Sequence, residues 1–362
     1  MLILASGAVL LTGTAVSAVA ANVSRIPTSP VQCSPFGEDA AASSDPDRGT
    51  ESPAQALAAE ESRVGPVSPE LLPLLRRMAE DRFRSGKLDE AAALQRRALK
   101  IAIGAEGAGA PDAAMAMIAL AQTEIVRRDY LDAEPLLIAA HLVFADQRER
   151  GQPELAQVLA GLSRVALSRG DDEAAVAFAR QAVALAADEP AAEPWRALAA
   201  ALAMQRHFAE GEQALDRALA RDRAAAGPDS LPTARSLSQL GNLYLRQQRF
   251  AEALPLIEEA AQIDQQQLAP THPLIADDLF DLGLVYDGLK RRRDAVTALR
   301  AALHRLRCGE ARHSVRVAYT DQELARLYRE QGDTAAADAA SAEARSILNA
   351  AEQAERKRER RA

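Results

Sequence analysis

The chain has 362 residues, of which 48% are hydrophobic, 4% aromatic and 26% charged, with a formal net charge of −8 and two cysteines. This composition excludes a disulfide-stapled mini-protein, a polytopic membrane protein and a basic nucleic-acid binder. Alanine accounts for more than a fifth of the residues. Alanine favours helix because it loses no side-chain entropy there, so the composition also argues against a β-sandwich or barrel and leaves an acidic interaction scaffold as the class to test.

Residues 1–21 carry no charge and contain the small-x-small pattern Ala18-Val19-Ala20 near their end. This pattern predicts a secretory signal peptide that is cut at about Ala20. No lysine or arginine precedes the apolar run, so two alternatives stay open: an uncleaved membrane anchor, because about 20 apolar residues span a bilayer, or a cytoplasmic protein whose start is wrongly assigned. We expect a periplasmic or secreted protein, or one that is membrane-anchored and faces the periplasm.

The next segment, residues 22–66, holds six prolines among Ser, Asp, Glu and Gly. It has little apolar surface to bury, so we predict a disordered Pro/Ser-rich linker. At the other end, residues 351–362 form a charged tail that reads AEQAERKRERRA. This tail is either the solvated end of a helix or a contact for acidic lipid or another polyanion.

Between these ends, over residues 67–350, one pattern repeats. The sequence LGNLY at 240–244 returns as LGLVY at 282–286 and as LARLY at 324–328, a step of 42 residues both times. We call the first residue of each motif the marker. Toward the N-terminus further markers fall at steps of 42, 36, 42 and 42 residues. The seven markers are Met78, Leu120, Leu162, Leu198, Leu240, Leu282 and Leu324.

Small residues return at fixed distances from the markers. The residue 20 positions after each marker is alanine in all seven units: Ala98, Ala140, Ala182, Ala218, Ala260, Ala302 and Ala344. The residues 1 and 13 positions after each marker are always Ala, Gly or Ser. Small side chains at these places let two antiparallel helices approach closely, and a larger one would cost about 1–3 kcal/mol by overpacking. The pattern therefore predicts about seven helix-turn-helix units with these alanines buried.

The combined pattern of Leu-Gly-x-x-Tyr, a small residue nine positions after the Tyr and an Ala seven further on resembles the tetratricopeptide repeat. The 42-residue step resembles the kinesin-light-chain-like variant of that repeat. The resemblance covers about residues 67–350 and implies an all-α, right-handed superhelical solenoid. Departures are Arg82 and Glu124 at the usual Tyr position and the 36-residue step from Leu162 to Leu198. They suggest an atypical first end and a local change of superhelical pitch.

In this family the first helix of each pair lines the concave face, where partners lie. The periodicity places five positions per unit on that face, at 5, 2 and 1 before the marker and 2 and 6 after it. The polar residues at or near these positions are Arg76, Arg77, Arg84, Gln122, Arg164, Arg196, Arg235, Gln239, Asn242 and Arg246, then Asp277, Asp281 and Asp287. Our partner-binding candidates are Arg164, Arg196, Arg235, Gln239, Asn242, Arg246, Asp277 and Asp281.

These candidates predict a basic strip that runs into an acidic patch. Arginine forks and an asparagine amide can hold the carboxylate or backbone of a peptide without reading much of its sequence. Asn242 matches the position of a peptide-holding Asn in the related carboxylate-clamp repeats, although the other clamp positions are not reproduced. The competing interpretation is that the charges only solubilise exposed helix faces.

The sequence offers no constellation for catalysis. The five histidines stand apart from other metal-ligand residues, and Gly104–Gly109 lacks the Gly-Lys-Ser/Thr of a phosphate loop. His272 lies in a Thr-His-Pro linker, where a capping or turn role is expected. We predict no catalytic residues, no metal and no cofactor, hence no enzyme.

Two functions remain as hypotheses. The first is an exported, non-catalytic scaffold that binds a peptide or partner helix in the concave groove. The second is a structural subunit of a cell-envelope assembly that uses its convex face or its ends and has no peptide groove. Both predict a protein or peptide partner, no nucleic acid, no small-molecule substrate and a possible membrane tether through residues 1–21.

Overall fold

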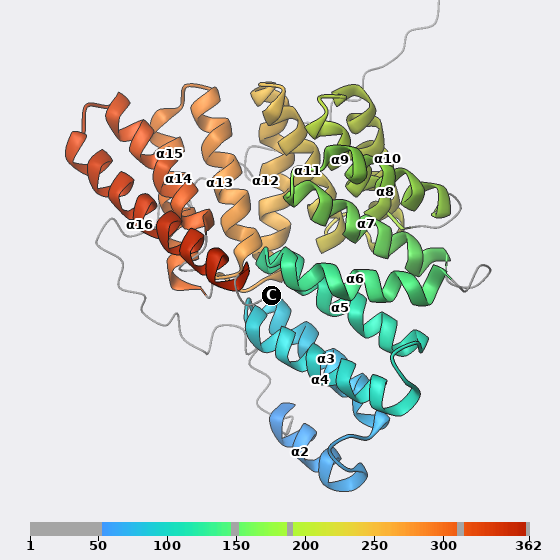
Figure 1. Cartoon of the computed structure of the whole chain (residues 1–362). Helices are drawn as coiled ribbons and strands as arrows, with labels where there is room; N and C mark the ends of the chain where they lie inside the picture. The colour runs from blue at the N-terminus through green and yellow to red at the C-terminus, as the bar shows by residue number, and fades with distance from the viewer. Residues whose placement is uncertain (1–52, 146–151, 187–190, 310–314, 360–362) are drawn as a thin grey trace, which may run out of the picture.

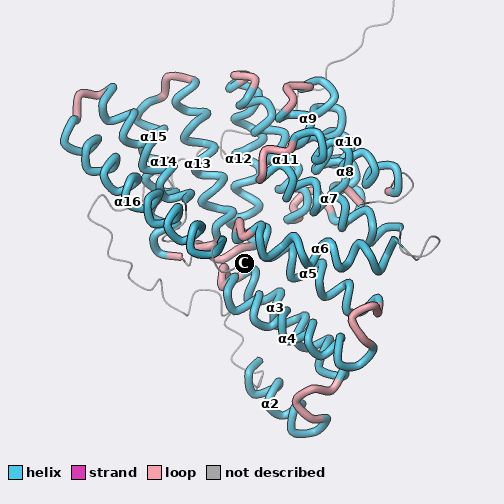
Figure 2. The backbone as a smooth tube through the Cα atoms, viewed as in Figure 1, coloured by secondary structure: helices cyan, strands magenta, loops and turns pink. Residues whose placement is uncertain are grey.

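The computed structural model describes residues 53–145, 152–186, 191–309 and 315–359. Over these ranges the chain consists of helices and the turns that join them, without a strand (Figures 1 and 2). None of the helices in these ranges is both long and apolar enough to cross a membrane. The predicted signal or membrane anchor, residues 1–21, lies outside the described residues, as does the linker up to residue 52.

Seven helical hairpins follow one another along the chain. The first helices of the hairpins are α3 (Leu72–Arg84), α5 (Pro111–Arg127), α7 (Gln152–Ser168), α9 (Glu193–Met204), α11 (Leu231–Arg246), α13 (Pro273–Gly288) and α15 (Val315–Glu330). The second helices are α4 (Leu88–Glu106), α6 (Tyr130–Ala145), α8 (Asp172–Leu185), α10 (Phe208–Ala226), α12 (Phe250–Gln267), α14 (Arg292–Cys308) and α16 (Thr334–Glu359). Each packs on its partner and on the next hairpin, which confirms the predicted all-α solenoid and its number of units.

One predicted boundary is wrong, because the end of the expected linker is helical. Helix α2 (Pro53–Val64) and the 3-10 turn η1 (Pro69–Leu71) precede the first hairpin. Leu57 and Val64 of α2 pack against the core of that hairpin, and Glu61 forms an ion pair with Arg97 of α4 at 2.5 Å. Apolar residues at helical spacing therefore give this stretch a surface to bury, which its proline content concealed. At the other end, α16 continues into the predicted tail as far as Glu359.

The small residues lie where the helices cross. The alanines 20 positions after the markers are all buried, with at most 4% of their surface exposed. At Gly241 even a methyl group has no room, because an added Cβ would lie 2.4 Å from Cγ1 of Ile257. At Gly283 it would lie 2.6 Å from Cγ of Leu299. The register inferred from the sequence is therefore the register of the packing.

The turn inside each hairpin has one conformation throughout. The residue eight positions after the marker has a positive φ in every unit: Gly86, Arg128, Gly170, Arg206, Gln248, Lys290 and Gly332. A left-handed residue at this place ends the first helix and lets its last carbonyls accept hydrogen bonds from the turn. Glycine takes this conformation at no steric cost, whereas the four other residues hold it under strain.

The first helices form the inner layer of the superhelix. Successive first helices contact one another at α5–α7, α7–α9, α9–α11 and α11–α13. The 36-residue step falls between α7 and α9, and these two helices pack directly against each other. The residues along the first helices therefore face the axis around which the hairpins wind.

The superhelix turns far enough for its first hairpin to touch its fifth and sixth (Figure 1). The backbone N–H of Ala269, in the α12–α13 loop, donates to the carbonyl of Arg84 at 3.0 Å. The ring of His272 packs edge-on against Phe83 with 5.4 Å between centroids. The inner face is consequently closed at this point rather than open along its whole length.

The structure confirms the capping role expected for His272 in the Thr-His-Pro linker. It is fully buried at the start of α13, where its Nδ1 accepts from the N–H of Leu274 at 3.2 Å. Burial lowers the pKa of this imidazole to about 4, so the ring is neutral and keeps an acceptor nitrogen at neutral pH. A histidine in this place stabilises the closure of the superhelix.

Candidate binding cavity

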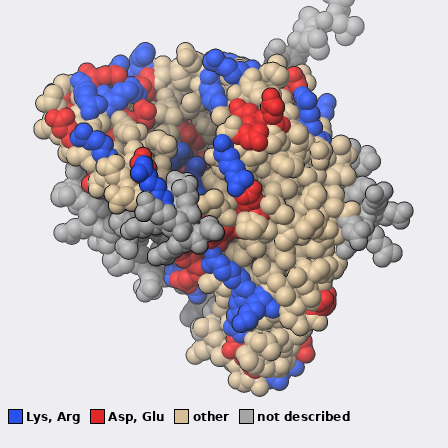
Figure 3. All heavy atoms as spheres, in the orientation of Figure 1, with Lys and Arg blue, Asp and Glu red and all other residues tan. Residues whose placement is uncertain are grey.

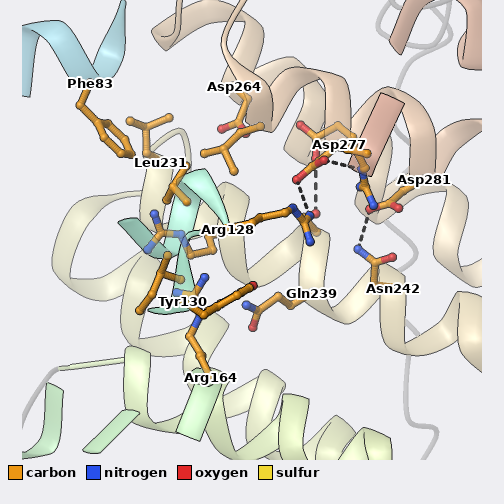
Figure 4. Close-up of a pocket in the computed structure, with 17 residues that line it drawn as sticks. Phe83, Arg128, Tyr130, Arg164, Leu231, Gln239, Asn242, Asp264, Asp277 and Asp281 are labelled. Atoms are coloured by element: carbon orange, nitrogen blue, oxygen red, sulfur yellow. Dashed lines mark hydrogen bonds and ion pairs between the residues drawn. The ribbon is translucent and has the colours of Figure 1, made fainter. Parts of the chain in front are cut away.

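A cavity of about 370 Å³ lies on the inside of the superhelix, next to the closing contact (Figure 4). Its walls come from α3, α5, α7, α11, α12, α13, α15 and the α5–α6 turn. The lining residues are Phe83, Ile125, Val126, Arg128, Tyr130, Arg164, Leu231, Arg235, Ser238, Gln239, Asn242, Asp264, Leu274, Asp277, Asp278, Asp281 and Arg316. A volume of this size suits a small ligand or a few residues of a peptide. Figure 3 shows a hollow over α12 and α13 with basic side chains inside it.

The cavity brings together most of the residues that the sequence singled out. Those that line it are Arg164, Arg235, Gln239, Asn242, Asp277 and Asp281. Arg246 lies in an adjoining cavity of about 250 Å³ that also has Gln239 and Asn242 in its wall. Its guanidinium lies 3.1 Å from the sulfur of Met204. The predicted basic strip and acidic patch are thus neighbouring walls of a single enclosed site.

Arg196 is the exception, and its predicted role as a groove contact is wrong. Its side chain is buried and donates to Glu193 at 2.6 and 3.0 Å, to Asp222 at 2.5 Å and to Ser236 at 3.3 Å. This position lies in the seam between α9, α10 and α11, because its partners Asp222 and Ser236 come from α10 and α11. Arg196 is a structural residue whose hydrogen bonds are made within the protein.

The basic wall of the cavity is organised around Glu193. Arg164 lies 3.3 Å and Arg235 lies 3.7 Å from its carboxylate, in addition to Arg196. Burial raises the pKa of Glu193, but the three guanidiniums outweigh it and bring the pKa down to about 2. The carboxylate of Glu193 is therefore shared by three arginines. Arg164 and Arg235, the two that line the cavity, make the longer contacts with it.

The acidic wall contains carboxylates that lack a close cation. Asp278 is 2% exposed, and among the described residues one of its oxygens accepts from Ser238 at 3.3 Å while the other has no donor. Burial raises the pKa of Asp264 to about 6, and burial together with the charge of Asp264 raises the pKa of Asp278 well above its ordinary value. The two carboxyl groups interact with each other, so the pair holds a proton more firmly than two separate aspartates would.

Two further contacts tie the acidic wall to other elements. Asp277 binds Arg128 of the α5–α6 turn at 3.2 Å and Arg316 of α15 at 2.7 Å. Asp281 accepts from the amide of Asn242 at 2.7 Å, and burial raises its pKa to about 6. Arg128, at the left-handed turn position, thereby holds the second hairpin against the sixth. Asn242 is occupied by this contact, as Figure 4 shows.

Several residues that line the cavity were not predicted from the sequence, and for one common reason. Arg128, Tyr130 and Arg316 reach the cavity from hairpins two and seven, and Asp264 reaches it from a second helix. A search restricted to the groove-facing positions of first helices cannot find them, because the closure of the superhelix brings distant units together. The available signal was the repetition of an acid 24 positions after the markers Leu198 and Leu240, at Asp222 and Asp264.

A second acidic cluster lies apart from the cavity. Within the described ranges, carboxylate oxygens of Glu124, Asp129 and Asp132 come within 4.8 Å of one another. Glu124 is fully buried and already binds Arg127 and Arg96, the latter at 2.6 Å. These arginines supply the positive charge that a cation would otherwise bring.

Together, the hairpins, their common turn and the inner cavity define the chain as an α-solenoid with a charged cavity on its inner face. Comparison with known families makes this specific: the model of the tetratricopeptide repeat matches residues 190–264 and 233–307. Those ranges cover the hairpins from α9 to α14, and the same register extends over the others. The chain contains tetratricopeptide repeats, which the family model matches over residues 190–307. Among curated protein sequences, none matches it.

Solved structures agree with the architecture. Aspartyl phosphate phosphatase F from Bacillus subtilis matches with a TM-score of 0.52 and 12% identity, over 83% of this chain and 76% of its own. Residues 41 to the end of MamA from Desulfovibrio magneticus RS-1 match with a TM-score of 0.39 and 18% identity, over 54% and 96%. A putative kinesin light chain from Podosopora anserina matches with 0.40 and 20%, over 55% and 96%. At these identities the similarity concerns the fold alone.

Proposed function

We propose that this protein is an exported, non-catalytic scaffold that binds a peptide segment of a protein partner on the inside of its superhelix. The cavity itself is the main support for this proposal. It gathers six of the eight predicted partner-binding residues, and its basic and acidic walls are only partly neutralised by contacts within the protein. Charged groups left in this state favour a ligand that completes their hydrogen bonds.

The repeat family supports a protein-binding role. Tetratricopeptide repeats are protein-interaction modules, and their first helices form the surface on which partners lie. In this chain the inner surface combines the charged cavity with the adjoining one, whose wall is mainly apolar and includes Leu167, Met204 and Leu243. The two share Gln239 and Asn242, so a peptide in the first has a place for an apolar side chain in the second.

One observation favours the alternative, a structural subunit of an envelope assembly that uses its convex face. Helix α6 exposes Leu131, Ile138 and Leu142 by 51%, 48% and 69%. Exposed apolar side chains on one outer helix are typical of a protein contact. The alternative predicts that substitutions on this face, and not in the cavity, abolish partner binding.

The experiment that separates the two is partner capture by crosslinking in the native host. We expect Arg164→Gln combined with Arg235→Gln to lose the captured partner. The control combines Arg180→Gln and Arg293→Gln, two exposed arginines on the outer helices α8 and α14, and should capture the partner normally. Equal capture by both double variants, each folded by circular dichroism, contradicts binding in the cavity.

Export through residues 1–21 is a separate part of the proposal. Mass measurement of the mature N-terminus tests it, because cleavage at about Ala20 leaves a defined mass, whereas an intact segment in the membrane fraction indicates an anchor. An intact chain in the cytoplasm contradicts export.

A further inference from the structure

Two buried acceptor atoms among the lining residues lack a donor in the described structure, one on the acidic wall and one beside Tyr130 and Arg164 (Figure 4). They are Oδ2 of Asp278 and Oε1 of Gln239. Asp278 is 2% exposed and carries Oδ2 beside Asp264, whose carboxylate has no cation within ion-pair distance among the described residues. Buried acceptors of this kind are costly to leave without a partner. A ligand that completes this wall must bring N–H donors and positive charge.

The arginine-lined wall of the cavity lacks negative charge. Among the described residues Arg164, Arg196 and Arg235 make ion pairs with only two carboxylates, Glu193 and Asp222, and Asp264 acts on Arg235 from beyond ion-pair distance. Arg196 uses both carboxylates, which leaves Arg164 and Arg235 with the weaker contacts. A ligand that completes this wall must bring a carboxylate, the group that arginine forks bind best.

The remaining wall is apolar. Phe83, Leu231 and Leu274 line it together with two aliphatic residues of α5. It offers no hydrogen bonds beyond those of the charged walls and has room for an apolar side chain. The three walls surround one volume of about 370 Å³, so a single small molecule meets all of them.

We propose that the cavity binds a small zwitterion, an α-amino acid or short peptide with free ends and an apolar side chain. Its ammonium group lies against Asp264 and Asp278, and its carboxylate lies against Arg164 and Arg235. This inference rests on the proposed function because it assigns a ligand class to the same cavity.

Binding of an ammonium group displaces the proton that the acidic pair holds. The charged and polar groups that face the pair are Arg235 and Ser238 of α11, Asp277 and Asp281 of α13, Arg316 of α15 and Arg128 of the α5–α6 turn. None of them makes an ion pair with Asp278 in the described structure. A ligand cation favours the ionised form of the pair, so binding weakens as the pH falls and the pair takes up a proton, and any proton lost on binding passes to the solvent.

The test is calorimetric titration of the full chain with defined ligands. We use the twenty free amino acids and the dipeptides leucyl-leucine, valyl-leucine and phenylalanyl-leucine, then the N-acetyl and C-terminal amide forms of the best binder. Blocking either end should weaken binding at least tenfold, since each block removes a charge-assisted contact. If free amino acids bind and the dipeptides do not, the cavity is an amino-acid site. If the dipeptides bind and the free amino acids do not, it is a peptide site. Equal binding of blocked forms, or no binding by the whole set, overturns the proposal.

Proton release provides an independent readout. Titrations in phosphate and in Tris, whose ionisation heats differ, should show proton release on binding to the unmodified protein. Asp278→Asn should abolish this release and weaken binding at least tenfold, whereas Asp338→Asn, at an exposed position on α16, should change neither. Release that persists in Asp278→Asn contradicts the assignment of the ammonium site.

The outcomes also separate this inference from the proposed function. If Arg164→Gln with Arg235→Gln loses the captured partner but no zwitterion binds, the interaction site stands and the ligand class is wrong. If a zwitterion binds and partner capture is unaffected by the same variants, the cavity is a small-ligand site and the scaffold uses another surface.

Discussion

Two acidic seams in this solenoid occupy the same repeat position and differ in two residues. Asp222 and Asp264 both lie 24 positions after a marker, and Ser236 and Asp278 both lie four positions before the next one. In the first seam Asp222 accepts from Ser236 at 2.6 Å and from Arg196 at 2.5 Å. In the second, Asp264 meets Asp278, and Ser238 stands two positions before the marker where Arg196 stands in the first.

This difference separates a structural site from a site with binding capacity. A buried carboxylate that already binds a cation and a hydroxyl has its charge and hydrogen bonds satisfied. A buried pair of carboxyl groups without a close cation instead favours a proton, which a bound cation can replace. The first seam closes the wall between hairpins, and the second opens into the cavity. Similar helices in the same register thus serve stability in one unit and recognition in the next.

The largest expected effect comes from removing the cation of the first seam. Arg196→Met leaves Glu193 and Asp222 buried without their principal partner, which should lower the free energy of unfolding by about 3–5 kcal/mol. Urea denaturation measures it. Arg164→Met, at a half-exposed position with one contact at 3.3 Å, should cost about 1 kcal/mol or less. Equal losses in the two variants would contradict a structural role for Arg196 that Arg164 does not share.

The pH dependence of stability should reveal the second seam. Asp264 and Asp278 have raised pKa values in the folded protein, so the folded state binds protons that the unfolded state has released above about pH 4. Their contribution therefore falls as the pH rises from about 4 through 6 and beyond. Asp278→Asn should lose less stability than the unmodified protein between about pH 5 and pH 8.

Asp222→Asn is the matched variant in the first seam. It removes a carboxylate that Arg196 and Ser236 both bind, so it should destabilise the protein at neutral pH. The two Asp→Asn changes then have opposite signs at about pH 8. Denaturation across the pH range measures both, and a parallel pH profile for Asp278→Asn and the unmodified protein would show that the second seam holds no such proton.

A smaller effect tests the register on which the comparison depends. At Gly241 an added Cβ would lie 2.4 Å from Ile257, so Gly241→Ala should cost about 1–3 kcal/mol by overpacking. Gly104→Ala, inside α4 with open space around it, should instead gain about 0.5–1 kcal/mol. Thermal melts that show the same sign for both variants would contradict the assigned helix crossings.

The smallest expected effect concerns the turns that hold both seams in place. Gln248 has a φ of 60°, so Gln248→Gly should gain about 0.5 kcal/mol by relieving a left-handed conformation. Gly332 has a φ of 83° with nothing nearby, and Gly332→Ala should cost about 1 kcal/mol. Urea denaturation of the pair measures the opposite signs, and stabilisation by Gly332→Ala would contradict the shared turn geometry.

The sequence was sufficient to predict the solenoid because small residues have few alternatives at a close helix crossing. Seven alanines at one position fixed the register, and the structure buries all of them. The residues between the markers could be placed on the inner layer for the same reason. Six of the eight selected residues meet in one cavity, which follows from the helical periodicity of the first helices.

The misplaced residues depended on distances that a repeat pattern does not contain. Arg196 is buried because Asp222 of α10 and Ser236 of α11 bind its guanidinium in the seam between hairpins four and five. Arg128 and Arg316 meet at Asp277 because the superhelix brings hairpins two, six and seven together. Curvature accumulates over many units, so one repeat does not reveal which distant repeats will touch.

The most direct test of the account replaces Tyr130 with a photoreactive phenylalanine derivative and irradiates the protein in its native host. Tyr130 lines the cavity, whereas Leu142, 69% exposed on the outer helix α6, receives the same residue as a comparison. Binding on the inner face predicts a crosslinked partner or small ligand at position 130 and none at position 142. A partner crosslinked at 142 alone would contradict it and identify the convex face as the site of interaction.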